Sequence, residues 1–155
     1  MVPRRGIAGI ALLLVAAAPA PSLLSPIERA CISSPFGVRG GQMHHGIDLP
    51  APAGAWVRAA APGRVEAVRR HGASGLHLQL RHADGSFTRY AHLGTVTPDI
   101  ASGRRIVALG DRLGRVGRTG STRGTHLHFE LHVGGLAVDP APSVGLRACV
   151  ALATA

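Results

Sequence analysis

The segment Thr125-His126-Leu127-His128-Phe129-Glu130-Leu131-His132-Val133 alternates strictly between polar and apolar side chains from its second residue onward. Successive side chains of a β-strand point to opposite faces, so this pattern predicts a strand with two different faces. We expect the apolar face to pack into the core. The opposite face carries His126, His128, Glu130 and His132. Alternate Cα atoms of a strand lie about 6.5 to 7 Å apart, so two of these imidazoles can serve one small site.

Shorter runs with the same two-residue period occur at 65–68, 76–80 and 87–90. The 21 glycines and 11 prolines of the chain supply turn signals between these runs and leave no helical pattern of useful length. The sequence therefore predicts a mainly β protein, an antiparallel sheet folded as a barrel-sandwich hybrid, with little helix after the first residues.

The beginning of the chain has the composition of an export signal. Arg4 and Arg5 precede a mostly apolar run over 7–18, and small residues and prolines follow. This order predicts a secretory signal peptide over 1–22 and an exported protein of the periplasm or cell envelope. The run is shorter than the roughly 20 residues of a membrane-spanning helix, so retention as an anchor is the weaker alternative. We expect one domain over 23–142 and assign no structure to the Ala-rich tail, 143–155.

All 17 basic residues are arginines, and the formal net charge is +9. Nucleic-acid binding is not expected, because the few aromatic residues do not interleave with the arginines. The charge reflects either overall composition or a loose attraction to an anionic envelope polymer. Nothing in the sequence indicates the oligomeric state.

Cys31 and Cys149 are the only cysteines and lie near the two ends of the predicted domain. In an oxidising compartment they can pair, which would stabilise the fold by roughly 4 to 5 kcal/mol in the chain-entropy model. The alternative is two small apolar side chains that are not bonded to each other.

A second segment, His44-His45-Gly46-Ile47-Asp48, offers an imidazole and a carboxylate on either side of a glycine. Together with the histidine strand it supplies two imidazoles and one carboxylate, which is the protein half of a catalytic zinc site with one open position. The spacing leaves open whether His44 or His45 is the ligand. His92, at the end of a predicted strand, adds one more imidazole.

Five motifs follow one another in an order that is specific to one family. They are Ser34-Pro35-Phe36-Gly37-Val38-Arg39, His44-x-Gly46-Ile47-Asp48, Pro62-Gly63-Arg64-Val65, Tyr90-x-His92-Leu93, and Gly117-Arg118-Thr119-Gly120-Ser121-Thr122-x-Gly124-x-His126-Leu127-His128-Phe129-Glu130. This order closely resembles the lysostaphin/LytM family of zinc endopeptidases of bacterial cell walls. The resemblance covers roughly 32–140. Arg123 and Thr125 depart from the Gly-Pro approach that many relatives have, and we expect this to change the shape of the loop more than the chemistry.

The resemblance implies that His44, Asp48 and His128 hold one Zn²⁺, which resolves the choice between His44 and His45. It also implies that His126 and His92 are the catalytic imidazoles beside the nucleophilic water. We expect His126 to transfer the proton and His92 to stabilise the oxyanion, with the reverse division left open.

The function implied by the resemblance is hydrolysis of peptidoglycan stem peptides or cross-links, with peptidoglycan as the partner and no stable membrane insertion after the signal is removed. The alternative is a non-catalytic envelope regulator that binds and activates other wall hydrolases.

Glu130 is expected either to support a ligand or to make a structural hydrogen bond. The other histidines are expected to be surface or strand residues: His71, His77, His82 and His132.

Overall fold

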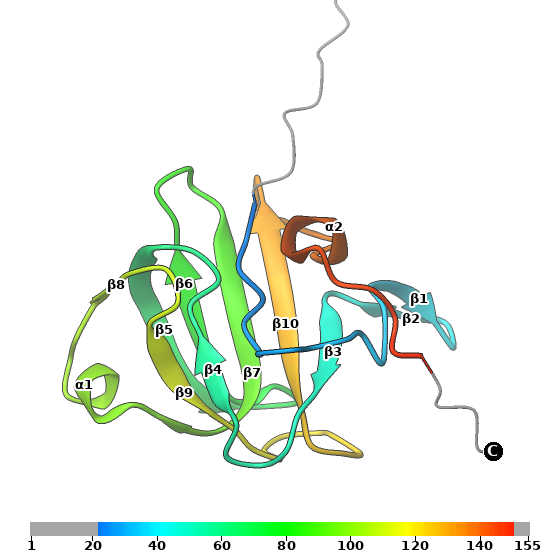
Figure 1. The fold of residues 1–155 in the computed structure, drawn as a ribbon, viewed down its shortest axis with the longest axis horizontal. Helices are drawn as coiled ribbons and strands as arrows, with labels where there is room; N and C mark the ends of the chain where they lie inside the picture. Colours follow the sequence, from blue (N-terminus) through cyan, green and yellow to red (C-terminus); the bar gives the residue numbers. More distant parts are fainter. Residues whose placement is uncertain (1–21, 151–155) are drawn as a thin grey trace, which may run out of the picture.

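The computed structural model describes residues 22–150, and strands dominate this part of the chain (Figure 1). The strands are β1 (Gly37–Arg39), β2 (Gln42–His44), β3 (Ile47–Pro50), β4 (Trp56–Arg58), β5 (Gly63–His71), β6 (Gly75–Arg81), β7 (Phe87–Val96), β8 (Ile106–Val107), β9 (Arg112–Val116), β10 (His126–Val133) and β11 (Leu136–Val138). Two one-turn helices, α1 (Pro98–Ala101) and α2 (Ala141–Val144), complete this region. The expected signal peptide lies outside the described residues except for Ser22. Between residues 22 and 150, no helix has the length and apolarity that a membrane span requires.

The strands form one large antiparallel sheet and one small hairpin. The main path through the large sheet is β11-β10-β7-β6-β5-β8. β3 also pairs with β10, and β9 pairs with both β7 and β4, so the sheet continues from β7 through β9 and folds back over its own face. Figure 1 shows β4 and β9 in front of the longer strands. The separate hairpin is formed by β1 and β2. The prediction of a mainly antiparallel β protein with little helix is confirmed.

β10 occupies the centre of the architecture, as its two-faced sequence predicts. It lies between β7 on one side and β3 and β11 on the other. Its residues Leu127, Phe129 and Leu131 are fully buried. Val133 differs from the expectation, because it is 44% exposed. The strand ends there at the Gly134-Gly135 turn, where the core no longer covers its apolar face.

The two ends of the domain are joined. Cys31 and Cys149 form a disulfide with their Cα atoms 4.8 Å apart, which confirms their pairing. The expected boundary at 142/143 falls inside α2, and Val144 packs against the core cluster. Ordered structure therefore extends beyond the boundary expected from composition, because the disulfide and α2 bring an Ala-rich stretch into contact with the sheet.

Candidate metal centre

Three potential metal ligands come from three strands that meet at one end of β10. His44 ends β2, Asp48 lies in β3, and His128 lies in β10 directly opposite Asp48. One donor atom from each residue lies within 4.8 Å of the others. Asp48 Oδ1 is 3.1 Å from His44 Nε2 and 2.9 Å from His128 Nδ1, and the two nitrogens are 3.0 Å apart. His45, the alternative that spacing left open, is exposed and does not belong to this cluster.

Gly46 allows β2 and β3 to approach β10 this closely. A Cβ atom at this position would lie 2.3 Å from the carbonyl oxygen of Phe129, which is backbone and has no room to move away. Only glycine therefore fits between the two predicted ligands without displacing β3 from β10.

The outer nitrogens of both imidazoles are held by acceptors, and this fixes where their protons lie. His44 Nδ1 donates to the carbonyl of Pro35 at 2.7 Å, and His128 Nε2 donates to Glu130 Oε1 at 3.1 Å. In the neutral imidazoles the lone pairs of His44 Nε2 and His128 Nδ1 then face each other and an oxygen of Asp48. Three lone pairs at such distances need a cation between them, either a proton or a metal ion. Two imidazoles and one carboxylate with anchored outer atoms are the donor set that Zn²⁺ prefers, so these residues fit a zinc ion.

Charge interactions inside the cluster shift the pKa values of its members. Burial opposes a charge on His128, but hydrogen bonds with Asp48 and Glu130 outweigh burial and raise its pKa to about 9. Burial likewise opposes a charge on Glu130, yet hydrogen bonds from His128 and His132 lower its pKa to about 2. For Asp48, burial is outweighed by the His128 hydrogen bond and the nearby imidazoles, and its pKa falls below the ordinary value. Without a metal, a proton on His128 therefore fills the cation position.

His126 and His92 flank the three potential ligands. His126 Nε2 lies 3.5 Å from Asp48 Oδ1, and the His92 ring centroid is 4.9 Å from that of His126 and 6.0 Å from that of His128. The loop after β9 holds both rings through their Nδ1 atoms. The carbonyl of Thr119 accepts from His92 at 2.8 Å, and that of Gly124 accepts from His126 at 3.1 Å. All five side chains predicted for the site therefore lie together.

His92 has a left-handed backbone, with φ at 60°, which is uncommon for a residue other than glycine. Such strain is retained where the surrounding structure imposes it, often at functional sites. Burial lowers the pKa of His92, so its imidazole is neutral at pH 7, with the proton on Nδ1 and a lone pair on Nε2.

A polar network supports the cluster on its inner side. Glu130 is 5% exposed and also accepts from His132 Nε2 at 2.5 Å and from Arg89 Nη1 at 3.2 Å. The His132 ring stacks on Phe87 with centroids 4.1 Å apart. Glu130 combines the two roles expected for it, support of a potential ligand and a structural hydrogen bond. Its Oε1 contacts His128, and its Oε2 contacts His132 and Arg89.

Sequence reasoning gave no role to Arg39 or Arg89. Arg39 Nη1 lies 3.6 Å from Asp48 Oδ2, whereas the histidine contacts are made by Oδ1. Arg89 lies opposite Glu130 in the β7–β10 register. The two-residue period over 87–90 places Arg89 on one face of its strand, but the partner strand is visible only in the fold.

The remaining histidines do not reach the cluster. His71 is exposed and His77 is half-buried, as expected for surface or strand residues. His82 differs, because it is 9% exposed. Its two ring nitrogens contact the Pro62 carbonyl at 2.8 Å and Thr88 Oγ1 at 2.9 Å, so it links the residue before β5 to β7.

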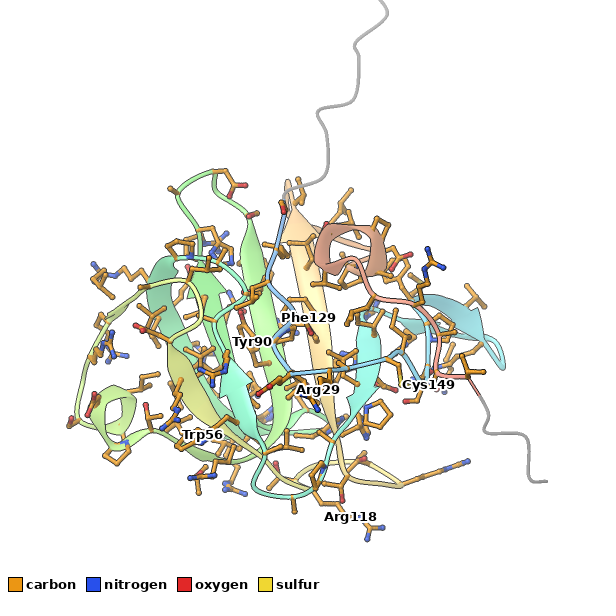
Figure 2. All side chains as sticks on the ribbon, viewed as in Figure 1. Arg29, Trp56, Tyr90, Arg118, Phe129 and Cys149 are labelled. Atoms are coloured by element: carbon orange, nitrogen blue, oxygen red, sulfur yellow. A yellow bond between two sulfur atoms is a disulfide. The ribbon has the colours of Figure 1, made fainter. Side chains whose placement is uncertain are left out.

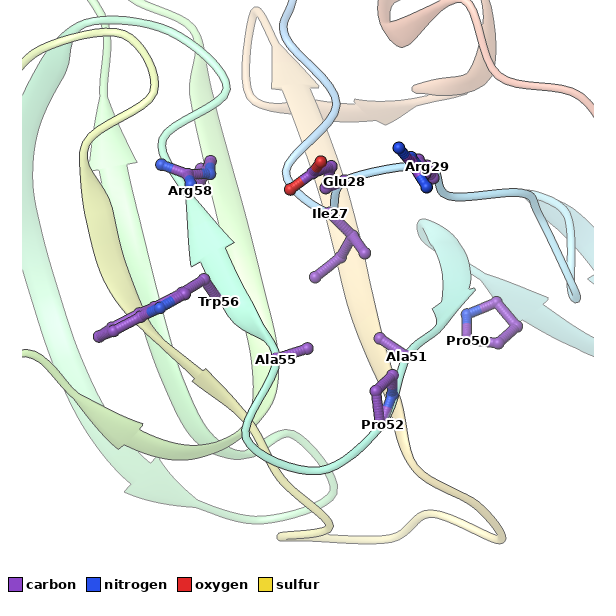
Figure 3. Close-up of a pocket in the computed structure, with 9 residues that line it drawn as sticks. All are labelled: Ile27, Glu28, Arg29, Pro50, Ala51, Pro52, Ala55, Trp56 and Arg58. Atoms are coloured by element: carbon purple, nitrogen blue, oxygen red, sulfur yellow. The ribbon is translucent and has the colours of Figure 1, made fainter.

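A cavity of about 570 Å³ lies between the N-terminal segment and β4 (Figure 3). Its lining consists of Ile27, Glu28, Arg29, Pro50, Ala51, Pro52, Ala55, Trp56 and Arg58. The Trp56 ring is covered by the guanidinium groups of Arg115 and Arg112, at 3.6 and 4.3 Å from its centroid. Figure 2 labels Trp56 and Arg29 of this lining on the whole fold. This cavity contains none of the predicted site residues, so the chemistry of the donors, not the size of a cavity, locates the candidate site.

Comparison with known sequences finds a match to Peptidase family M23 over residues 42–140. The DD-carboxypeptidase/endopeptidase Mpg of Neisseria meningitidis serogroup B is 40% identical over 123 residues, which are 76% of this chain and 28% of that protein. The peptidoglycan DD-endopeptidase ShyC of Vibrio cholerae is 34% identical over 131 residues, again 76% of this chain and 28% of that protein. The chain thus spans little more than a quarter of the length of these curated relatives.

Solved structures share the fold. The catalytic domain of lysostaphin from Staphylococcus simulans aligns with a TM-score of 0.62 and 26% identity, over 74% of this chain and 89% of that one. A zinc-containing peptidase from Vibrio cholerae aligns with a TM-score of 0.58 and 29% identity, over 77% of this chain and 37% of that one. The family match contains all five clustered side chains.

Proposed function

Because the chain belongs to Peptidase family M23, we propose that it is a zinc-dependent endopeptidase that hydrolyses stem peptides or cross-links of bacterial cell-wall peptidoglycan. The observation that carries this proposal is the convergence of lone pairs from His44, Asp48 and His128, with two further imidazoles beside them. The relatives named for endopeptidase activity and for peptidoglycan support the choice of reaction and substrate.

In this proposal His44, Asp48 and His128 hold one zinc ion. A zinc ion bound there supplies Lewis acidity, which polarises a carbonyl and lowers the pKa of water toward about 7. The anchoring of His44 Nδ1 by Pro35 and of His128 Nε2 by Glu130 directs the inner nitrogens of both imidazoles toward Asp48, so that they can coordinate zinc once the inner proton of His128 is lost.

His126 is the residue we assign to proton transfer. Its Nδ1 is held by the Gly124 carbonyl, which leaves Nε2 free on the side of Asp48. An imidazole in this position can accept a proton from the attacking water and pass one to the leaving amine.

His92 fits a different role from the one expected from sequence. A neutral imidazole with its proton on Nδ1 accepts a hydrogen bond at Nε2 and cannot donate one to an oxyanion. We therefore assign His92 to orienting the attacking water. Its strained backbone and its anchor to Thr119 are consistent with a fixed orientation.

The remaining parts of the proposal concern location and partners. The arginine-flanked apolar run before the domain supports export to the periplasm or cell envelope with a signal peptide over 1–22. Peptidoglycan is the proposed partner. No nucleic-acid partner is proposed, since aromatic side chains do not accompany the arginines.

The test is mass analysis of the fragments released from purified peptidoglycan, with and without a metal chelator. We expect soluble peptide-containing fragments whose masses identify the bond that is cut, no release with the chelator, and recovery when zinc is added back. Release that is insensitive to the chelator would contradict zinc dependence. No release by the zinc-loaded protein, combined with stimulation of a second wall hydrolase, would favour the regulator instead.

A further inference from the structure

A short segment connects the disulfide to the metal centre. This segment, residues 31–35, is called the strap here. Ser33 N donates to the Asp48 carbonyl at 3.0 Å, and Asp48 N donates to the Ser34 carbonyl at 2.9 Å. Ser33 Oγ adds a third hydrogen bond to the Asp48 carbonyl at 3.2 Å. The strap ends at Pro35, whose carbonyl holds His44 Nδ1. Two of the three proposed ligands are thus held by these five residues.

The other edge of the strap is attached to the C-terminal part of the domain. Ile32 N donates to the Arg147 carbonyl, and Cys149 N donates to the Ile32 carbonyl, both at 2.9 Å. Next to these hydrogen bonds, the disulfide joins Cys31 to Cys149. The strap therefore lies between β3 and the segment 147–149, as an added strand-like layer with a covalent bond at one end.

We propose that the Cys31–Cys149 disulfide positions the strap for zinc binding, so that the oxidised protein binds zinc more tightly than the protein without this bond. The inference rests on the proposed zinc site. Within the described residues, the C-terminal segment has few other constraints, because Arg147, Ala148 and Val150 are exposed. Without the disulfide, two backbone hydrogen bonds to Ile32 would hold it, and segments with so few buried contacts open easily.

Opening of that segment reaches the ligands through the strap. If the strap moves, His44 loses the acceptor that fixes its proton on Nδ1, and Asp48 loses the hydrogen bonds that fix its backbone. Loss of such outer contacts typically weakens metal binding about 10- to 100-fold. The strap pairs with Ala148 and Asp48 and not with β5 or β8, so we expect those two strands to keep their pairing.

Both cysteines are half-buried, and a cavity of about 460 Å³ that includes Cys149 in its lining gives access to the bond. Formation of the bond removes two protons and two electrons from the thiols. An incoming disulfide of an exchange partner takes them up and becomes two thiols. Such partners act in oxidising compartments outside the cytosol. The inference therefore makes completion of the zinc site depend on arrival in such a compartment.

The experiment compares zinc affinity in the full protein and in the double variant Cys31→Ser/Cys149→Ser, by competition with a chelating dye. Use of the variant removes the disulfide without a thiol reductant, which would itself bind zinc and disturb the measurement. The matched control is Val107→Ala, which removes buried side-chain volume from β8 at the far edge of the sheet. Backbone amide hydrogen exchange is measured in parallel at Asp48 and at Leu78 and Leu80 of β6.

We expect the cysteine variant to bind zinc about 10- to 100-fold more weakly. Loss of the bond also lowers the stability of the whole fold, so exchange rises in β6 as well, but exchange at Asp48 relative to β6 should be faster than it is in Val107→Ala. The Val107→Ala protein should lose thermal stability but keep the zinc affinity of the parent. Equal affinities of parent and cysteine variant would overturn the inference. A cysteine variant in which exchange at Asp48 and in β6 keeps the ratio found in Val107→Ala would also overturn it, because the bond would then support the whole fold and not the strap in particular. Absence of zinc binding by the oxidised parent would refute the proposed function itself.

Discussion

His44 Nε2 and His128 Nδ1 lie 3.0 Å apart, although 84 residues separate them along the chain. The β3–β10 pairing brings them together, because it places His128 directly opposite Asp48, and Gly46 then lets β2 approach. Two nitrogen lone pairs and a carboxylate oxygen repel one another at this distance unless a cation lies between them. The proposed zinc site is therefore electrostatically unbalanced without a proton or a metal ion.

Replacement of His128 is expected to abolish zinc binding. In the His128→Ala variant, two ligands remain, and Asp48 and Glu130 lose the partner that lies between them. Metal analysis should show protein without zinc, and digestion of purified peptidoglycan should stop. His71→Ala is the matched control, because His71 is exposed and outside the cluster. Undiminished digestion by His128→Ala would rule out the proposed ligand set.

Replacement of His126 is expected to separate metal binding from turnover. The His126→Ala variant keeps all three proposed ligands, so its zinc content should match that of the parent. Loss of a positioned proton-transfer group typically lowers the rate about 10²- to 10⁴-fold. Zinc content and the initial rate of fragment release are measured on the same preparation. A zinc-free variant would show that His126 coordinates the metal instead.

The alternation of polar and apolar residues in β10 predicted more of the fold and site than any other feature of the sequence. Strand periodicity is local, so it can be recognised without knowing which strands lie beside it. It identified the buried face of Leu127, Phe129 and Leu131 and the polar face with His126 and His128. The family resemblance, which the match over 42–140 confirms, chose His44 over His45. Local spacing alone was unable to make that choice, since both histidines precede the same glycine.

Long-range contacts were not predictable in the same way. The strap is linked to Asp48 by backbone hydrogen bonds, which leave no pattern of side chains in the sequence. The contact of Arg39 with Asp48 depends on where the β1–β2 hairpin lies. α2 was missed because its four residues include Pro142 in an Ala-rich stretch, where composition gives no helix signal.

Gly46→Ala tests the close approach of β3 to β10. The added Cβ would meet the Phe129 carbonyl oxygen at 2.3 Å, so the strands must separate. We expect a loss of about 1 to 3 kcal/mol in the free energy of unfolding, as for other overpacked sites, together with weaker zinc binding. Gly124→Ala is the control, because a Cβ there meets nothing within 4 Å. Equal thermal stability of the two variants would contradict the tight contact.

Glu130→Gln tests the support of His128 from behind the cluster. Glutamine keeps the size of the side chain but removes the negative charge that holds the proton on His128 Nε2. We expect zinc affinity to fall about 10- to 100-fold. Glu66→Gln serves as the control, since Glu66 is an exposed carboxylate that pairs with Arg81 and Gln79, away from the ligands. If both variants bind zinc like the parent, Glu130 has a structural role only.

Zinc binding is expected to release a proton from His128. In the metal-free protein, burial is outweighed by hydrogen bonds with Asp48 and Glu130, and the pKa of His128 is raised to about 9. A raised pKa means that the charged imidazole stabilises the metal-free fold fully below its ordinary pKa of about 6.5, and that this stabilisation disappears as pH rises through about 9. Because zinc must displace this proton and also lowers the pKa of water toward about 7, its affinity should rise at least tenfold per pH unit from about pH 7 to 9 and less steeply above pH 9.

Titration calorimetry in two buffers of different ionisation enthalpy measures the release directly. At about pH 8, we expect about two protons per zinc ion bound, one from His128 and one from water whose pKa zinc lowers toward about 7. His92 should contribute none, since burial lowers its pKa and keeps it neutral at this pH. The Glu130→Gln protein should release less, because His128 loses one of the two carboxylates that raise its pKa. A binding enthalpy that is independent of the buffer would show that His128 carries no proton in the metal-free protein. The nitrogen lone pairs of His44 and His128 would then have to be separated by another cation or by a rearrangement of the side chains.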